Sequence, residues 1–283
     1  MARRVLSARR GAEDRTPSAR DIRRVEALVS RLGELKGLPM KFGQMVSYLE
    51  IEMPEETRRI MGLLQTQSPA TPWERVQAVI REDLGEDADD LLSNLEPEPA
   101  SIASIGQVHR GRLPDSTQVA VKVRHPEIEE AIRSDFNAAG MGSSMAGIMM
   151  PGMGATARDF ISEMKQRLME ECDYGLEADR QELFASLYRD HPAVIVPAVH
   201  RRWCAPRVLT TTWQDGLTFE QFRTQAPQQE LDRAGETLFD FYIGTLFRHD
   251  VFHADPHPGN YHFTDGKVVV FDYGCVRVFS REM

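Results

Sequence analysis

Apolar residues recur every three or four positions in long stretches of this chain, and they alternate with polar residues in several short ones. The first spacing predicts helices and the second predicts strands. Helical spacing begins at Asp21, continues through residues 40–49 and extends to about residue 92; it returns over 156–189 and over about 228–247. The first helical stripe consists of Ile22, Val25, Leu28, Val29, Leu32 and Leu35. We therefore predict a helical leader and two later helical regions.

Short β-type runs lie between and after these helices. Residues 93–123 contain two such runs, separated by Gly111 and by a turn at Pro114 and Asp115, and further runs cover 193–200 and 207–213. After the last helix, "NYHF", "TDG" and "KVVVFDYG" read as a β-hairpin. The order of elements predicts an α+β protein with two lobes and mostly antiparallel strands.

Composition narrows the class of protein. The 283 residues carry a formal net charge of −9, which argues against nucleic acid as a partner. The three cysteines are widely separated, so neither a disulfide framework nor a cysteine-zinc site is indicated, and a cytosolic protein is expected. Residues 1–20 predict a flexible basic tail rather than a signal peptide. The most apolar segment, 138–153, is too short to span a bilayer, which leaves peripheral membrane contact open.

The stretch "FHADPHPGNYHF" concentrates possible metal ligands near the end of the chain. His253, Asp255, His257 and His262 are residue types that zinc accepts, as in a metal-dependent hydrolase. A solvated loop with scattered histidines is an alternative. His253, Asp255 and Asn260 also fit the pattern H-x-D-x-x-x-x-N of a kinase catalytic loop, in which the aspartate acts on the attacking hydroxyl and the asparagine binds a metal ion.

The hairpin that follows supports the kinase interpretation. Antiparallel pairing of its strands brings Asn260, just before the first strand, beside Asp272, just after the second. Asp272, Tyr273 and Gly274 stand where a kinase has D-F-G, whose aspartate holds magnesium. We therefore expect Asn260 and Asp272 to bind Mg²⁺ and Asp255 to act as the catalytic base. His253 is expected to brace the loop, and His257 and His262 to have structural or surface roles.

The strand "VAVKV" supplies a candidate phosphate ligand. The two-residue period of a strand places Lys122 and Ala120 on the face opposite the valines. An isolated lysine of this kind usually lies on an edge strand, but V-A-I-K is part of the kinase signature and its lysine contacts the nucleotide phosphates. This strand, the catalytic loop and the metal aspartate occur in the kinase order, which predicts a kinase-like site.

A phosphate loop should precede that strand. Aligned on Val108, "SIASIGQV" has Ser101 and Ala103 at the first two glycine positions of the kinase loop and Gly106 at the third, with Ser104 between them. Serine and alanine restrict the backbone that glycine leaves free. We expect a stiffer loop than in ordinary kinases, and the match alone is weak.

The carboxylate partner of Lys122 should lie on a helix between the strand and the catalytic loop. In "LMEECDYGLEADR", Asp173 and Glu177 are four residues apart and share a face, and Glu170 and Glu171 are also available. Such a run of acids is ordinarily a solvated helix face. The other kinase fragments favour a functional role here.

Taken together, "KFGQ", "ASIASIGQVH", "VAVKVRHP", "ECDYGLEA", "FHADPHPGN" and "DYG" resemble the UbiB family of atypical kinase-like proteins, also called the AarF or ADCK family. The resemblance covers roughly residues 30–280. It implies a protein-kinase-like fold with a helical extension, in which Lys41 and Gln44 lie near the nucleotide. Glu171 and Asp173 would be the acidic partners of that segment, and Glu177 would pair with Lys122.

The resemblance also implies a function and a domain plan. We expect ATP or ADP and Mg²⁺ as ligands, and an ATPase or a small-molecule or lipid kinase that supports ubiquinone or other isoprenoid-lipid biosynthesis. A nucleotide-dependent scaffold for a lipid-biosynthesis complex is the alternative. The expected segments are a tail (1–20), a helical extension (21–92), an N-lobe with a helical insertion (93–213) and a truncated C-lobe (214–283). The last feature predicts a fragment of a longer protein or, less simply, a short form completed by a partner.

Overall fold

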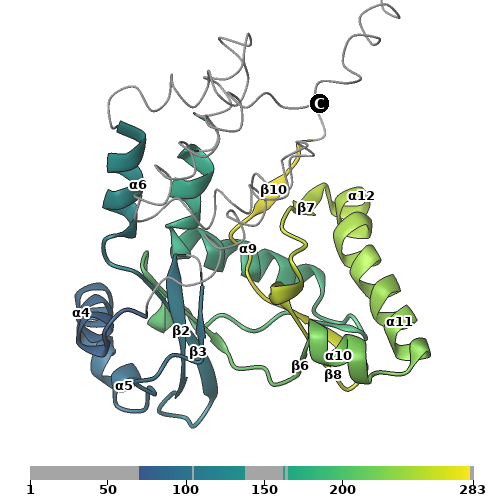
Figure 1. Cartoon of the computed structure of the whole chain (residues 1–283), viewed down its shortest axis with the longest axis horizontal. Helices are drawn as coiled ribbons and strands as arrows, with labels where there is room; N and C mark the ends of the chain where they lie inside the picture. The colour runs from purple at the N-terminus through teal and green to yellow at the C-terminus, as the bar shows by residue number, and fades with distance from the viewer. Residues whose placement is uncertain (1–69, 104, 138–161, 163–164, 281–283) are drawn as a thin grey trace, which may run out of the picture. The chain divides into compact units, whose positions relative to one another are not determined.

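The structure is a computed structural model that describes residues 70–103, 105–137, 162 and 165–280 (Figure 1). The predictions for the basic tail, Lys41, Gln44 and Ser104 fall outside these residues. The chain divides into two compact units, one formed by residues 1–67 and 130–162 and the other by 68–129 and 163–283. Nearly all described residues belong to the second unit.

The first sheet has the strand order β1-β2-β3-β5, and all neighbouring strands are antiparallel. The strands are β1 (Ser101–Ile102), β2 (Gly106–Arg112), β3 (Gln118–Arg124) and β5 (Val208–Thr212). The strands and the turn predicted over 93–123 and 207–213 are therefore present. In β3 the valines at 119, 121 and 123 are buried, while Ala120 and Lys122 are only partly so.

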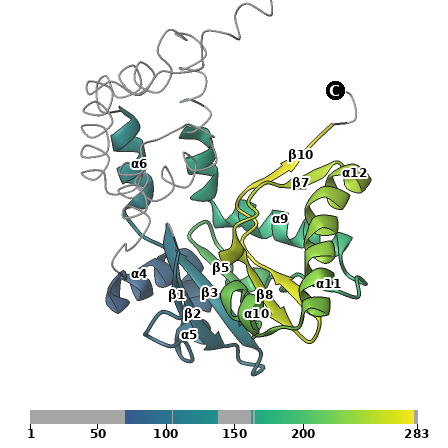
Figure 2. The same ribbon diagram turned by 45° about the vertical axis from the view of Figure 1, so that its right-hand side comes forward.

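Two helices cover one face of this sheet, here called the helix face. They are α4 (Trp73–Leu84) and α5 (Ala88–Leu92), joined by the 3₁₀ turn η2 (Gly85–Asp87), and Figure 2 shows both beside β2 and β3. Ile80 and Leu91 pack with Val119 and Val121 in one apolar cluster. The alternation of β3 dictates this arrangement, because its valines point to one face and Lys122 points to the other, here called the cavity face.

The helical stretch predicted over 156–189 is interrupted where the structure describes it. Residues 165–171 are helical, and a new helix, α9 (Tyr174–Leu187), starts after Asp173. The side chain of Asp173 accepts hydrogen bonds from the backbone amides of Gly175 (2.9 Å) and Leu176 (3.3 Å), so it caps α9. An earlier helix, α6 (Ile128–Asn137), follows β3.

The second sheet has the order β4-β9-β8-β6. Its strands are β4 (Val194–Ile195), β9 (Lys267–Val270), β8 (Tyr261–Thr264) and β6 (Leu217–Thr218). The hairpin predicted after the last helix is β8 and β9. The run predicted over 193–200 contributes only the two-residue β4, which pairs in parallel with β9. A separate pair, β7 (Val251–His253) and β10 (Val276–Val278), is antiparallel.

Helices α10 (Phe219–Gln225) and α11 (Gln228–Phe239) precede these strands. The helix predicted over 228–247 is present, but it widens into the π-helical turn η4 (Asp240–Gly244) before α12 (Thr245–His249). Short 3₁₀ turns η3 (Arg201–Trp203) and η5 (Pro258–Asn260) complete the unit. The aromatic core of this lobe contains Phe184, Phe241, Tyr242, Phe263 and Tyr273.

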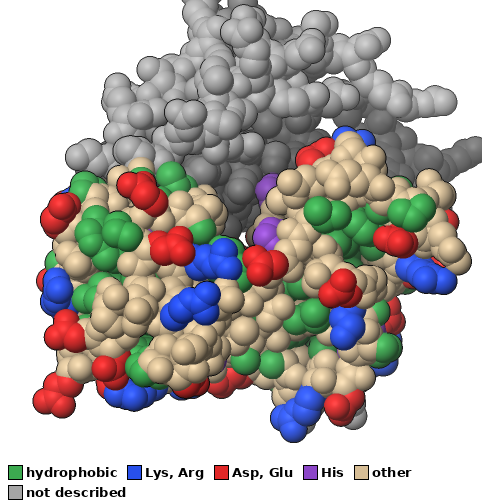
Figure 3. All heavy atoms as spheres, turned by 90° about the horizontal axis from the view of Figure 1, so that it is seen from below, with side chains coloured by type: hydrophobic (Ala, Val, Ile, Leu, Met, Phe, Trp, Pro, Cys, Tyr) green, Lys and Arg blue, Asp and Glu red, His purple; other side chains and the backbone are tan. Residues whose placement is uncertain are grey.

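Charged side chains of both signs are interspersed over the described part of the face shown in Figure 3. Ion pairs join a number of charged side chains among the described residues. Arg201 lies 2.5 Å from Asp179, and Arg202 lies 2.7 Å from Asp87. Within the described residues, no helix is both long and apolar enough to cross a membrane.

Candidate nucleotide-binding site

A cavity of about 220 Å³ lies on the cavity face of the first sheet and reaches the β8–β9 hairpin. The first sheet contributes Val108, Ala120, Lys122, Leu209 and Thr211 to its wall, and α9 contributes Glu177 and Gln181. The remaining wall residues are Ala103, Trp213, Gln214, Gly259, Asn260, His262, Phe271 and Asp272. The cavity therefore joins the predicted lysine strand, the acidic helix and the metal residues.

Lys122 lies between two carboxylates in this cavity. Its Nζ atom is 2.9 Å from both carboxylate oxygens of Glu177 and 3.6 Å from Oδ2 of Asp272. The Lys122 and Glu177 side chains are 15% and 4% exposed, so water screens their attraction poorly. The ion pair that the resemblance implied is present, and Glu177 rather than Glu170 or Glu171 forms it.

Burial and the neighbouring acids act on the pKa of Lys122 in opposite directions. Burial lowers this pKa, but Asp272 and Glu177 outweigh burial and hold it well above its ordinary value, so the amine stays an ammonium. Burial raises the pKa of Glu177, and Lys122 opposes this shift. The cavity thus presents one ammonium, suited to a phosphate, beside carboxylate oxygens of the kind that hard cations prefer.

His253 braces the loop predicted to be catalytic, as expected from the sequence. It is fully buried, and its Nδ1 atom lies 3.4 Å from the backbone nitrogen of Asp255 while Nε2 lies 2.8 Å from the carbonyl oxygen of Asp272. Since the amide donates to Nδ1, Nε2 carries the hydrogen that the carbonyl accepts. Burial also lowers the pKa of His253, which favours this neutral form. One imidazole thus fixes the backbone of both acidic residues.

Asp255, Asn260 and Asp272 are brought together by the hairpin. The backbone nitrogen of Phe271 donates to the carbonyl of Asn260 (2.9 Å), which places Asp272 at the end of the strand beside Asn260. The Nδ2 atom of Asn260 donates to Oδ2 of Asp255 (3.2 Å). The amide oxygen of Asn260 and the carboxylate of Asp272 are hard oxygen ligands on the wall of the same cavity. These residues therefore fit Mg²⁺.

Asp272 adopts a backbone conformation that few residues other than glycine adopt, although aspartate tolerates it better than most. Its φ angle is +58°, in the left-handed region. The Oδ1 atom accepts a hydrogen bond from the amide of Gly274 (3.1 Å), and Arg180 donates to the carbonyl of Gly274. These bonds hold the Asp-Tyr-Gly turn so that the carboxylate points toward Lys122.

The loop before β2 contains Gly106 for a steric reason. A Cβ atom at Gly106 would lie 2.5 Å from the hydroxyl of Tyr174 and 2.5 Å from the carbonyl oxygen of Val123. Close packing behind the loop therefore requires this glycine. Ala103 and Val108 line the cavity, whereas Ser101 is exposed on β1.

The other predicted acids occupy different positions. Asp173 caps α9, and Glu171 lies beside Gly274, 3.8 Å from a Cβ atom built on that glycine. Glu170 pairs with Arg167 (2.7 Å) and Arg180 (3.1 Å). The assignment of Glu171 and Asp173 as partners of Lys41 and Gln44 stays a prediction.

Sequence reasoning missed several cavity residues: Gln181, Leu209, Thr211, Trp213, Gln214, Gly259, His262 and Phe271. A signal existed for Trp213, the last residue of the predicted strand "RVLTTTW", and for Gln214, which follows it directly. His262, which was expected to have a structural or surface role, is half-buried and contributes to the cavity wall. Along β8, His262 alternates with the buried Tyr261 and Phe263, so its side chain points to the opposite face of the strand, toward the cavity.

The zinc hypothesis finds no geometric support in the described part of the chain. No three His, Cys, Asp or Glu side chains there are arranged to hold a metal ion. His257 is exposed and accepts a hydrogen bond from the amide of Gly259 (3.1 Å), and His253 is engaged on both nitrogens. The histidines of this loop serve its conformation.

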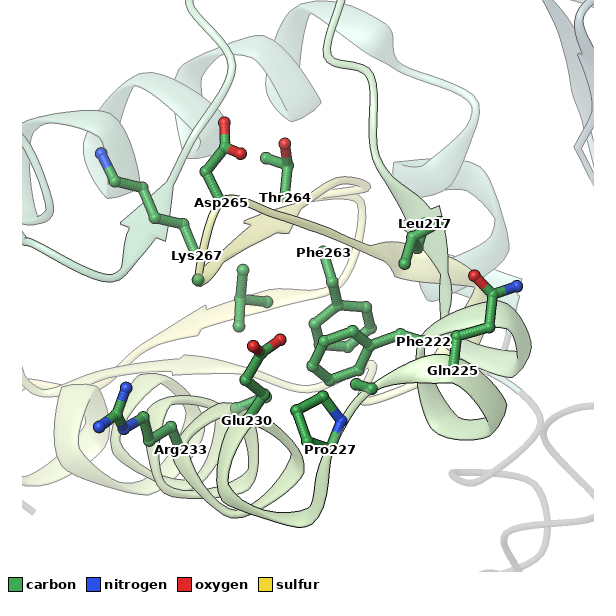
Figure 4. A pocket seen from close by; sticks show the side chains of 14 residues that line it. Leu217, Phe222, Gln225, Pro227, Glu230, Arg233, Phe263, Thr264, Asp265 and Lys267 are labelled. Carbon is green, nitrogen blue, oxygen red and sulfur yellow. The ribbon is translucent and has the colours of Figure 1, made fainter.

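A second cavity of about 380 Å³ lies between α10, α11 and the β8–β9 turn (Figure 4). Phe222 and Phe263 stack at its centre with ring centroids 4.1 Å apart, and Glu230, Arg233 and Lys267 lie at one end. Its size exceeds that of the first cavity. Its wall contains none of the predicted phosphate or metal ligands, so the first cavity is the nucleotide-site candidate.

Comparison with known proteins agrees with this architecture. The family model of the ABC1 atypical kinase-like domain matches residues 63–283. The chain is 33% identical over 253 residues to "Protein ACTIVITY OF BC1 COMPLEX KINASE 1, chloroplastic" of Arabidopsis thaliana, covering 86% of this chain and 36% of that protein. It is 31% identical to "Atypical kinase COQ8B, mitochondrial" of Rattus norvegicus, covering 91% of this chain and 49% of the relative.

A solved structure gives the same result. Rv3197 of Mycobacterium tuberculosis, solved as a complex with erythromycin, is 32% identical, with a TM-score of 0.66 over 89% of this chain and 64% of that chain. The chain thus spans about a third to a half of the length of the curated relatives described above. The two-lobed α+β fold, the lysine–glutamate pair and these matches lead to one conclusion: the chain belongs to the ABC1 family of atypical kinase-like proteins, the UbiB family.

Proposed function

We propose that the first cavity binds ATP or ADP with Mg²⁺ and that the chain is an ATPase or a small-molecule or lipid kinase. The observation that carries this proposal is the position of Lys122, 2.9 Å from Glu177 and 3.6 Å from Asp272 in a cavity that Asn260 also lines. A lysine fixed in this way is a ready phosphate ligand, and the two metal-ligand candidates are within the same wall.

Each residue has a distinct task in this proposal. Glu177 orients Lys122, whose ammonium neutralises phosphate charge. Asp255, held by Asn260, accepts the proton of the attacking hydroxyl or water. Asn260 and Asp272 would hold Mg²⁺, which supplies charge neutralisation at the transferred phosphate. Rate enhancement would come from positioning and electrostatics rather than from covalent chemistry.

Substitution of Asp272 tests the proposal. Asp272→Asn removes a metal ligand with little change in shape, so magnesium-dependent stabilisation by ATP should disappear, and phosphate release should fall at least about a hundredfold. Thermal shift with ATP, ADP or no nucleotide, with and without magnesium, measures the first quantity. If both nucleotide affinity and turnover survive the substitution, the assignment is wrong.

A nucleotide-dependent scaffold is the second candidate. The observation in its favour is the serine and alanine at Ser101 and Ala103, where a catalytic kinase loop has glycines. Asp255→Asn discriminates between the two, because an enzyme loses phosphate release when its base is removed. A pure binder shows no measurable release before or after the change and retains nucleotide affinity.

The cellular role is proposed from the relatives. Proteins named atypical kinase COQ8 or COQ8B are among them, which supports a role in ubiquinone or other isoprenoid-lipid biosynthesis, with an isoprenoid lipid or a biosynthetic complex as partner. A location in the cytoplasm, with peripheral membrane contact, completes the proposal. Lys41 and Gln44 are proposed to lie near the nucleotide, with Glu171 and Asp173 as the acidic partners of their segment.

A further inference from the structure

A buried polar cluster lies on the helix face of the first sheet, away from the cavity. Its members are Thr71, Gln107, His109 and His125, here called the Thr71 clamp. Gln107 is 1% exposed and His109 is not exposed at all. Polar groups buried to this extent are costly unless each finds a partner.

The side-chain amide of Gln107 binds both sides of one backbone residue. Its Oε1 atom accepts from the Thr71 nitrogen (2.7 Å), and its Nε2 atom donates to the Thr71 carbonyl (3.2 Å). This pairing imitates the two hydrogen bonds of an antiparallel β-bridge. The chain is thereby fixed to β2 just before α4 begins.

His109 completes the cluster in one tautomer. Its Nδ1 atom lies 2.8 Å from the carbonyl oxygen of Glu96 and must donate to it. Its Nε2 atom therefore accepts the second amide hydrogen of Gln107, at 2.8 Å. Every polar atom of the Gln107 amide is used. A carboxylate at position 107 would place an acceptor against the carbonyl oxygen of Thr71. A protonated His109 would place an N–H donor at Nε2 against the Nε2 donor of Gln107.

The clamp also reaches Ile105, on the other side of Gly106 from Gln107, through His125. The hydroxyl of Thr71 lies 2.6 Å from Nδ1 of His125, and the backbone nitrogen of His125 donates to the carbonyl of Ile105 (2.9 Å). Thr71 is therefore connected to residues on both sides of Gly106. The segment that leads into β2 is therefore attached on the helix face at two residues, Ile105 and Gln107.

The same strand faces the proposed nucleotide. Gln107 and His109 point to the helix face, while Val108 between them lines the cavity. A shift of β2 that breaks the clamp therefore moves Val108 and the loop before it. We propose that Gln107 and His109 are positioning residues for the nucleotide site, so that nucleotide binding and attachment of the chain at Thr71 stabilise one another.

This inference rests on the proposed function only in taking the first cavity as a nucleotide site. Thermodynamic linkage makes it quantitative, because a clamp that raises nucleotide affinity by some factor must itself be stabilised by nucleotide by the same factor. The two directions can be measured separately on the full chain.

The experiment compares Gln107→Met with Gln228→Met, the same substitution at a glutamine whose side chain donates to Asp232 (2.7 Å) on the exposed surface of α11. Hydrogen exchange at the Thr71 amide and MgATP affinity are the two readouts. In Gln107→Met we expect the Thr71 amide to exchange about tenfold faster and MgATP affinity to fall severalfold, since at least one buried hydrogen bond is lost. In the wild type, MgATP should slow exchange at Thr71. Gln228→Met should change neither quantity.

The possible failures are distinguishable. Faster exchange at Thr71 with MgATP affinity unchanged within twofold would overturn the coupling while leaving the nucleotide site intact. Absence of MgATP binding in the wild type would overturn the proposed function and the coupling with it. If Gln107→Met does not fold, Thr71→Val removes only the hydroxyl contact with His125. It should shift both readouts in the same direction by a smaller factor, and a shift in exchange alone contradicts the proposal.

Discussion

The two faces of the first sheet carry polar clusters of opposite kind. On the helix face, the Thr71 clamp is a hydrogen-bonded cluster of amide, hydroxyl and imidazole groups in which the Gln107 amide has all its partners, while Nε2 of His125 is buried and finds no partner among the described residues. On the cavity face, Lys122 lies between two carboxylates. A hydrogen-bonded network of uncharged groups favours one conformation, whereas clustered charges and carboxylate oxygens suit an ion or a charged ligand. The difference supports a structural role for the helix face and a ligand-binding role for the cavity face.

Removing the positive charge of Lys122 from the cavity face should have the largest effect on activity. Lys122→Met eliminates the proposed phosphate ligand and leaves Glu177 buried without its partner. Phosphate release should fall by roughly 10²–10³-fold, as when one preorganised charge or donor is lost from other sites. A phosphate-release assay measures this, and Lys267→Met on the exposed end of β9 is the control. Equal rates in wild type and Lys122→Met would contradict the contrast between the faces.

Gly106, at the start of β2, tests the packing beneath the loop. Gly106→Ala forces a methyl group against Tyr174 and Val123, and we expect the free energy of unfolding to fall by about 1–3 kcal/mol. Gly235→Ala on α11 is the matched control, since a Cβ there meets no atom within 4 Å. That control should be stabilised by about 0.5–1 kcal/mol. Denaturant titration compares the two, and similar midpoints would mean that the close packing is not needed.

The clamp should make the helix face sensitive to acid. Burial lowers the pKa of His109 below its usual 6.5, so the unfolded chain binds more protons than the folded one near pH 6. The free energy of unfolding should therefore decrease as the pH falls below about 6.5. Burial lowers the pKa of His125 and His253 as well, so His109→Asn should remove only part of the slope, about 1 kcal/mol per pH unit. Denaturant titrations between pH 7.5 and 5.5 measure the slopes; identical slopes would exclude His109.

Features that depend only on residues close together in the sequence were predicted correctly. The alternation in "VAVKV" placed Lys122 opposite the valines, and the hairpin placed Asn260 beside Asp272, because period and turn fix both. The ion pair with Glu177 needed the family resemblance in addition. Short-range information was therefore sufficient for Lys122, Asn260 and Asp272, but not for Glu177.

Long-range packing was beyond the sequence. The break at Asp173 was missed because the helical period continues across it, although an aspartate is a good cap. The parallel pairing of β4 with β9 joins residues more than seventy positions apart. Gln107 and His109 gave no signal as a clamp, since their partner Thr71 precedes them by a whole pair of helices.

The π-helical turn Asp240–Gly244 gives the helix between α11 and α12 one residue more than an ordinary α-helix would need. Each residue of an α-helix adds about 100° of rotation, and a π-turn accommodates one residue more than an α-turn does. Phe241 and Tyr242 use this turn to contact His253, with ring centroids 5.7 and 5.3 Å away. Deleting one residue here would convert the π-turn into an ordinary α-turn and leave α11 and α12 in nearly the same rotation, because the wider turn absorbs the extra residue locally. What the deletion would change is the placement of Phe241 and Tyr242 against His253, so the extra residue serves the packing behind Asp255.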